Sequence, residues 1–133
     1  MVAVLIFSMG VLTIVSLQSM SVRQSSQAKY RADAMLLAND LVSQMWVTDR
    51  QFSTLSTNFV AGGAAYDIWL DTVTAALPGA ADFPPEVTVD SIPGGGGAAA
   101  APSSRVTVVL QWKPPSAAPG DAANNLTMVS QIK

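Results

Sequence analysis

The residues with the clearest potential for chemistry are two acids, Asp67 and Asp71, which stand four positions apart in a stretch with helical spacing. Carboxylates at this separation share one face of a helix, where they could bind a cation or divide acid and base roles. The chain has no His and no Cys, and no third acid lies near the pair at ligand spacing. Asp67 also suits the first turn of a helix, where the macrodipole favours negative charge. We therefore expect a solvated helix face.

The lack of His and Cys excludes several classes of site from the whole chain. Disulfides, thiol nucleophiles, imidazole bases and the common zinc sites all need one of these two residue types. Nothing in the sequence resembles a nucleophile accompanied by a base and an orienting group. The sequence thus predicts no catalytic residue, no metal, no cofactor and no small-molecule substrate, and it indicates that the chain is not an enzyme.

Two short motifs add little to this picture. Asn125, Leu126 and Thr127 match the N-glycosylation sequon, a pattern that often arises by chance. The four glycines at 94–97, followed by four alanines, lack the preceding strand and following helix of a phosphate-binding loop. This run is predicted to be a flexible linker.

The length and the net charge of the chain limit which architectures and which partners are possible. A chain of 133 residues is long enough for one small domain and an anchor. Its net charge is −2 and its sequence pI is about 4.7. Because a nucleic-acid groove needs clustered Lys and Arg to offset phosphates, no nucleic-acid partner is predicted.

Residues 1–22 contain no charged residue and are apolar all round. As a helix they would span about 33 Å, close to the roughly 30 Å hydrocarbon core of a bilayer. About ten Leu, Ile, Val and Phe residues would favour insertion by a total on the order of 3–6 kcal/mol. We predict a transmembrane half-helix whose lipid-facing side chains include Val4, Leu5, Ile6, Phe7, Val11, Leu12, Ile14, Val15 and Leu17.

Two other interpretations of residues 1–22 fit less well. A buried core helix would need more apolar surface around it than so short a chain provides. A cleaved signal peptide would need a basic N-terminal region and a small-x-small cleavage site, and the sequence has neither at the right distance.

Residues 23–48 continue the helix without Pro or Gly, but with one apolar face. The side chains predicted to pack this half against a sheet are Ala34, Met35, Leu37, Ala38, Leu41, Val42, Met45 and Trp46. Arg31 falls within the apolar arc and is expected to extend toward its edge. Leu36 falls among polar residues, either as an ordinary exposed leucine or as a contact to a neighbouring subunit.

Residues 49–133 are predicted to form a small head. Residues 49–65, rich in Ser, Thr and Gly, read as a loop, and 66–77 as a short helix that Trp69 anchors on a sheet. Alternating segments at 86–92, 104–113 and 126–132 predict three antiparallel strands joined by flexible loops. The predicted head core is Trp69, Leu70, Val106, Val108, Leu110 and Trp112. The expected fold class is α+β, with the amphipathic half-helix covering the sheet.

Several stretches resemble type IV pilins. MVAVLIFSMGVLTIVSLQS resembles the segment that follows the leader in minor pilins, and AKYRADAMLLANDLVSQMW resembles the second half of the helix in PilV-type pilus modification proteins. IWLDTVTAALPG and VTVVLQWKPP also fit that subfamily. The resemblance covers nearly the whole chain and implies a pilin-like fold, with a long N-terminal helix packed on a small antiparallel sheet.

The resemblance also implies a function. It suggests a structural minor pilin of type IV pilus assembly, held in the bacterial inner membrane with its head in the periplasm and then incorporated into the surface filament. Its partners would be inner-membrane lipid, other major and minor pilins, and the pilus assembly machinery. The apolar half-helix would then pack against its counterparts in the filament. Two alternatives are a minor pseudopilin of type II secretion and a single-pass periplasmic binding or sensory module.

Three departures from the family pattern affect this expectation. The leader, its cleavage glycine and the family's glutamate are missing, and the sequence is expected to begin just after them. The Cys pair of many relatives is also missing. Arg23, Lys29 and Arg31 follow the apolar run, so the positive-inside tendency alone would place them in the cytoplasm. A basic leader would restore the family's orientation.

Overall fold

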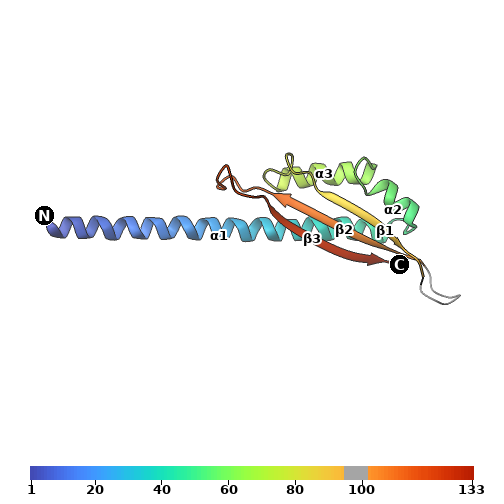
Figure 1. Ribbon diagram of the computed structural model, residues 1–133, viewed down its shortest axis with the longest axis horizontal. Helices are drawn as coiled ribbons and strands as arrows, with labels where there is room; N and C mark the ends of the chain where they lie inside the picture. The colour runs from blue at the N-terminus through green and yellow to red at the C-terminus, as the bar shows by residue number, and fades with distance from the viewer. Residues whose placement is uncertain (95–101) are drawn as a thin grey trace.

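One helix of 46 residues, α1 (Val2–Val47), runs along the molecule, and every other element gathers beside its second half (Figure 1). The computed structural model describes residues 1–94 and 102–133. After α1 come α2 (Phe52–Asn58), α3 (Ala64–Ala76), β1 (Glu86–Ile92), β2 (Ser103–Trp112) and β3 (Asn124–Ile132). The predicted α+β layout of a long N-terminal helix and a small three-stranded antiparallel sheet is confirmed.

The helix α1 is uninterrupted, as predicted, because its sequence contains no Pro and only one Gly, Gly10. It ends at Thr48, whose backbone is extended. Both the main-chain N–H and the hydroxyl of Thr48 donate to the carbonyl oxygen of Gln44, at 3.0 and 2.8 Å. These two bonds use a carbonyl that the last turn would otherwise leave without a partner.

The sheet has the order β1-β2-β3, with both pairs antiparallel. Its register aligns apolar residues across the strands, since Val87 lies opposite Val108 and Val108 lies opposite Met128. Side chains alternate between a buried and an exposed face, as predicted for all three strands. The contacts of α1 with β2 and β3 show that the long helix covers the buried face.

The prediction of a loop over residues 49–65 is wrong, because α2 occupies Phe52–Asn58. Leu55 and Phe59 lie four positions apart and are both buried in the core. Asp49 supports the start of α2 by accepting hydrogen bonds from the main-chain N–H of Gln51 and the hydroxyl of Thr54. Burial of two large side chains therefore outweighs the low helix propensity of the Ser- and Thr-rich sequence.

The second short helix, α3, begins two residues before the predicted start and is held on α1. The indole N–H of Trp69 donates to the carbonyl oxygen of Leu37 in α1 at 2.9 Å. This bond attaches α3 to α1, and Trp69 also lies in the core cluster that contains the buried side chains of the sheet. The hydroxyl of Tyr66 donates to the carbonyl oxygen of Pro85 at 2.6 Å, which ties the start of α3 to the chain entering β1.

The connections between the strands complete the head. The connection between β1 and β2 was predicted as a flexible linker with a Gly and Ala run, and most of that prediction, residues 95–101, lies outside the described residues. The connection between β2 and β3 is described throughout and lies at the end of the head next to the projecting half of α1 (Figure 1).

Candidate functional site

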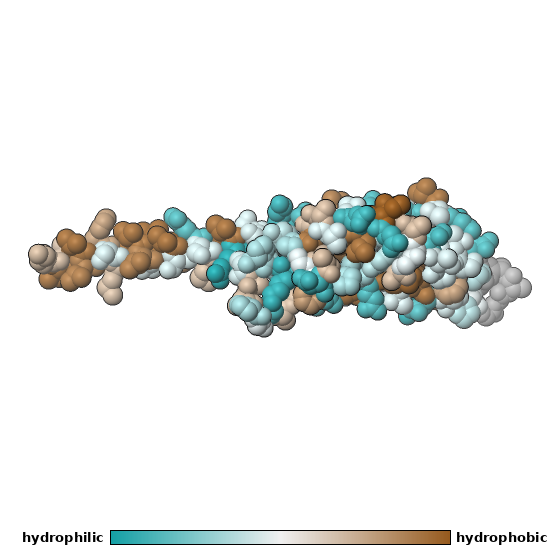
Figure 2. Space-filling model, turned by 90° about the horizontal axis from the view of Figure 1, so that it is seen from above, coloured by the Kyte–Doolittle hydropathy of each residue, from teal (hydrophilic) through white to brown (hydrophobic). Residues whose placement is uncertain are grey.

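The most distinctive surface is the projecting half of α1, residues 2–22. The nine side chains predicted to face lipid are all exposed, from 44% of the surface of Val11 to 74% of that of Phe7. Figure 2 shows mostly apolar residues, coloured brown, along this half, whereas polar and apolar residues are mixed on the head. Soluble proteins rarely expose so large a continuous apolar surface, which marks it as an interaction surface.

The length and composition of this half match a lipid bilayer. Its most apolar stretch has a mean hydropathy of 2.0 and no part of it is buried in the protein. Twenty-one helical residues rise about 31 Å, compared with the roughly 30 Å hydrocarbon core. Among the described residues, α1 is the one helix that is long and apolar enough to cross a membrane.

Three hydroxyl groups in the projecting half have partners within the helix itself. Ser8, Thr13 and Ser16 donate to carbonyl oxygens three or four residues earlier, at 2.9 to 3.1 Å. Because an unpaired polar group is costly in hydrocarbon, these bonds lower the cost of placing the hydroxyls among lipid chains. The segment therefore needs no polar partner for these three side chains.

The second half of α1 packs into the head. Of the eight predicted side chains, six are buried: Ala34, Leu37, Ala38, Leu41, Val42 and Met45. The prediction is wrong for Met35 and Trp46, which are 48% and 44% exposed. Both lie just outside the edge of the buried arc, and the ring of Trp46 is instead approached by the Arg50 guanidinium, 6.0 Å from the ring centre.

The head core contains the predicted side chains and several that sequence reasoning missed. Trp69, Val106, Val108, Leu110 and Trp112 are buried, and Leu70 packs against the core while partly exposed. The missed core members from the two short helices and the segments beside them are Leu55, Phe59, Tyr66, Val73, Leu77 and Ala80. The spacing of Leu55 and Phe59 was a signal that could have revealed α2.

The residues considered for chemistry do not come together. Asp67 and Asp71 are both exposed on α3, and Asp67 lies in its first turn. Within residues 1–94 and 102–133 no group of three or more His, Cys, Asp or Glu side chains could hold a metal ion. Asn125 of the sequon is exposed on β3.

The side chain of Leu36, on the polar side of α1, is 69% exposed, which is compatible with both interpretations given for it.

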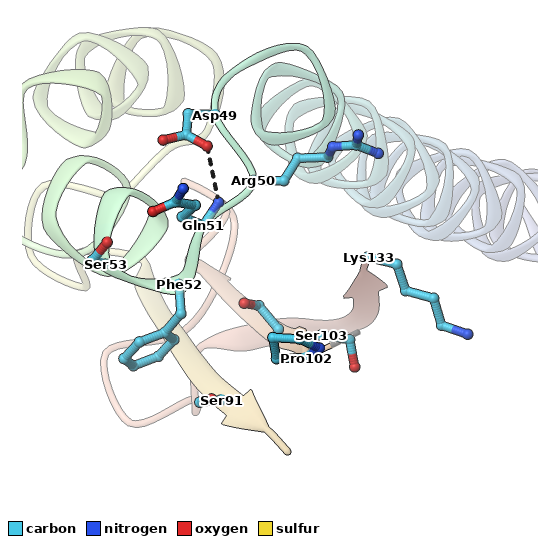
Figure 3. Close-up of a pocket in the computed structure, with 10 residues that line it drawn as sticks. Asp49, Arg50, Gln51, Phe52, Ser53, Ser91, Pro102, Ser103 and Lys133 are labelled. Carbon is cyan, nitrogen blue, oxygen red and sulfur yellow. Dashed lines mark hydrogen bonds between the residues drawn. The ribbon is translucent and has the colours of Figure 1, made fainter. Parts of the chain in front are cut away.

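A hollow of about 680 Å³ lies where α1 gives way to α2, beside the end of β1 and the start of β2 (Figure 3). Several of its polar groups are already paired, since Asp49 accepts from Gln51 and Ser103 accepts from Gln131 at 2.6 Å. The side chains of Arg50 and Lys133 both extend to the right in this view, away from Phe52 and Ser91 (Figure 3). The hollow thus offers no set of side chains that converge on a ligand.

Comparison with known protein families, with curated proteins and with solved structures finds no match for this chain. Function must therefore be inferred from the arrangement of the chain itself.

Proposed function

We propose that this chain is a filament subunit of the type IV pilin class, a minor pilin of the PilV type that resides in the bacterial inner membrane before entering a pilus. The observation that carries the proposal is the division of α1. Its first half is apolar on all sides and uncovered, and its second half is a structural element of the head.

This division suits a subunit that changes its surroundings without unfolding. In a bilayer, residues 2–22 would be covered by lipid chains; in a filament, equivalent helices of neighbouring subunits would cover the same side chains. Lipid chains are about as apolar as Leu, so moving from one to the other costs little hydrophobic free energy. Close packing between helices could then favour the filament.

The head would remain folded in both surroundings because its core does not use the projecting half. The buried part of α1 begins at Ala34, more than two turns beyond the last residue of the apolar segment. A head of this kind presents its own surface to neighbouring subunits and to the assembly machinery. We expect that surface to decide which subunits lie next to this one.

The test is incorporation into sheared filaments. Pili are sheared from cells, separated from membranes and probed with an antibody against the head. The matched control replaces residues 2–22 by an unrelated transmembrane helix, which keeps the head at the membrane. We expect the natural chain in the filament fraction and the control in the membrane fraction only, with fewer surface pili when the gene is deleted.

Other outcomes would favour the alternatives. A chain that stays with the membrane, in cells whose pili and motility are unchanged by deletion, would indicate a single-pass binding or sensory module. Loss of type II secretion with normal pili would indicate a pseudopilin. Either result would contradict the proposal.

A further inference from the structure

The end of the head nearest the apolar half of α1 contains a polar cleft. A hollow of about 350 Å³ lies between α1 and the connection from β2 to β3, and one of about 120 Å³ lies between α1 and the strand ends that this connection joins; Gln27 and Asn124 line both of them. We call their combined space the collar cleft. The residues that matter for its chemistry are Arg23, Gln27, Arg31, Trp112, Asn124 and Asn125.

Three of these residues continue the packing face of α1 toward the membrane. Arg23, Gln27 and Arg31 are spaced four apart, so they lie on one face of the helix. At 100° per residue they fall on the same side as Ala34 and Leu41, which are buried against the head. The face that packs on the sheet therefore changes from apolar to cationic and amide-bearing where it enters the cleft.

Trp112 lies beside this cleft and carries a buried donor without a partner. The side chain is only 3% exposed, and its indole nitrogen is the one buried side-chain N or O atom of the described residues without a hydrogen-bond partner. Trp112 also lines the smaller hollow, together with Arg31 and Asn125. A buried N–H without an acceptor costs about 1–3 kcal/mol, so this nitrogen is a polar atom beside the cleft that the head itself leaves unpaired.

The charges around the cleft favour an anion. Arg23 and Arg31 supply two guanidinium groups, and the amides of Gln27, Asn124 and Asn125 supply further N–H donors. One carboxylate, Asp121, lines the larger hollow, and its oxygen already accepts from the main-chain N–H of Ala118 at 2.8 Å. Planar guanidinium groups match the oxygens of a phosphate, whose remaining lone pairs can accept from the amide N–H groups.

The position of the cleft identifies the source of the phosphate. Arg23 follows directly after the apolar segment, and Arg31 is eight residues, about 12 Å, farther along the helix axis. Helical side chains incline toward the N-terminus, so the long Arg31 side chain extends back toward the bilayer. The headgroup layer occupies roughly the first 5–7 Å beyond the hydrocarbon core. Both guanidinium groups can therefore reach it.

We propose that the collar cleft binds the phosphate of an anionic phospholipid headgroup while the chain is in the membrane. Arg23 and Arg31 would hold the phosphate oxygens, and the indole of Trp112, which lines the same cleft, would lie beside the bound headgroup. This inference rests on the membrane insertion of residues 2–22, which is part of the proposed function, and does not depend on incorporation into a filament.

The experiment uses the full chain in nanodiscs of phosphatidylcholine into which phosphatidylglycerol is titrated. The indole N–H resonance of Trp112, assigned by its loss in Trp112→Phe, is followed by NMR. We expect a saturable shift of this resonance, because Trp112 lines the cleft that the headgroup would enter. The variant Arg31→Gln should weaken the apparent affinity about tenfold, because it removes a charge-assisted hydrogen bond.

The matched control is Lys29→Gln. Lys29 carries the same charge only two residues away, but it lies on the opposite side of the helix from the cleft. Its loss should change the affinity less than about twofold, as expected for general attraction to an anionic surface. Equal effects of Arg31→Gln and Lys29→Gln would overturn the inference in favour of nonspecific attraction.

A second arm separates the source of the phosphate. The full chain in dodecyl maltoside micelles is titrated with inorganic phosphate, and we expect little or no shift at concentrations where the lipid saturates. A shift with inorganic phosphate but not with lipid would overturn the lipid assignment. A resonance insensitive to both would mean that the cleft holds only water, although the proposed function would stand. Failure to enter nanodiscs would overturn both the inference and the membrane part of the proposed function.

Discussion

The two halves of α1 have the same backbone and opposite surroundings. The first half exposes apolar side chains on every side, and the second half buries one apolar face against β2, β3 and α3. The difference shows that helix formation and helix packing are separate consequences of the sequence. The first half gains nothing from the head, so its stability depends on a medium or a partner outside the chain.

The largest expected effect concerns the buried half. Leu41 is fully buried, so Leu41→Ala should lower the free energy of unfolding of the head by about 2–5 kcal/mol through lost burial and an unfilled cavity. The matched control is Leu36→Ala, on the exposed side of the same helix, with an expected change within about 0.5 kcal/mol. Urea titration of the full chain in detergent, followed by tryptophan fluorescence, measures both.

This prediction tests whether the second half of α1 is a structural part of the head. Equal midpoints for Leu41→Ala and Leu36→Ala would mean that the helix merely passes beside the sheet. Membrane association should be the same in both variants, since the apolar half is untouched.

The exposed half is tested by a charge at its centre. Ile14→Arg should cost about 2.5–3.5 kcal/mol of insertion free energy, a large part of the estimated gain of the segment. We expect a substantial fraction of the chain to be extracted from membranes by alkaline carbonate. Leu36→Arg, which adds the same charge to the exposed side of the second half, should leave the chain in the membrane.

An Ile14→Arg chain that remains fully resistant to extraction would contradict membrane insertion of this half. The free energy of unfolding of the head should be the same in Ile14→Arg as in the natural chain. A change there would show that the two halves are not independent.

Two glycines, one in the head and one in the projecting half of α1, differ in their surroundings in the same way. A Cβ on Gly63 would lie within 2.5 Å of main-chain atoms of Thr57 and Asn58, whereas a Cβ on Gly10 would meet nothing within 4 Å. Gly63→Ala should therefore destabilise the head by about 1–3 kcal/mol, because α2 and α3 would have to move apart. Gly10→Ala should leave the head unchanged. The urea unfolding midpoints of the two variants measure this difference. Equal midpoints would show that the turn before α3 accommodates a Cβ at residue 63 without loss of stability.

Much of the fold could be predicted because it follows from the periodic spacing of apolar residues along the sequence. The uninterrupted helix follows from the lack of Pro, and the alternation of Val106, Val108 and Leu110 gives β2 directly. The helix α2 was missed because its Ser- and Thr-rich composition resembles a loop. Only the spacing of Leu55 and Phe59 reveals it, and two residues are a weak signal by themselves.

The remaining differences depend on three-dimensional placement. The head covers an arc of about 140° on α1, narrower than the half-circle that the sequence pattern indicated, so Met35 and Trp46 fall outside it. The partner of the Trp69 indole is a main-chain carbonyl 32 residues away, which no local pattern encodes. The collar cleft likewise requires knowing that the connection from β2 to β3 lies beside Arg23 and that the strand ends it joins lie beside Arg31.

The smallest expected effect concerns a hydrogen bond inside the head. The pH dependence of the unfolding free energy provides a second test of the same bond. Tyr66 donates to the carbonyl oxygen of Pro85, so Tyr66→Phe should lower the free energy of unfolding by about 0.5–1.5 kcal/mol at neutral pH. Tyr30→Phe is the matched control, because the Tyr30 hydroxyl makes no hydrogen bond to the described residues. It should change the stability by less than about 0.5 kcal/mol.

Burial, with a smaller contribution from the negative charge of Asp67, raises the pKa of the Tyr66 hydroxyl above its ordinary value of 10.0. A raised pKa in the folded state means that this stabilisation is fully present below the ordinary value and is lost as the pH rises through the folded one. The difference in unfolding free energy between the natural chain and Tyr66→Phe should therefore be constant up to about pH 10 and shrink above it. Lysines and other tyrosines that titrate in the same range affect both chains equally and cancel in that difference. A difference that stays constant through the alkaline range would mean that the hydroxyl is not held in the core, and that α3 is tied to the head by Trp69 and Val73 alone.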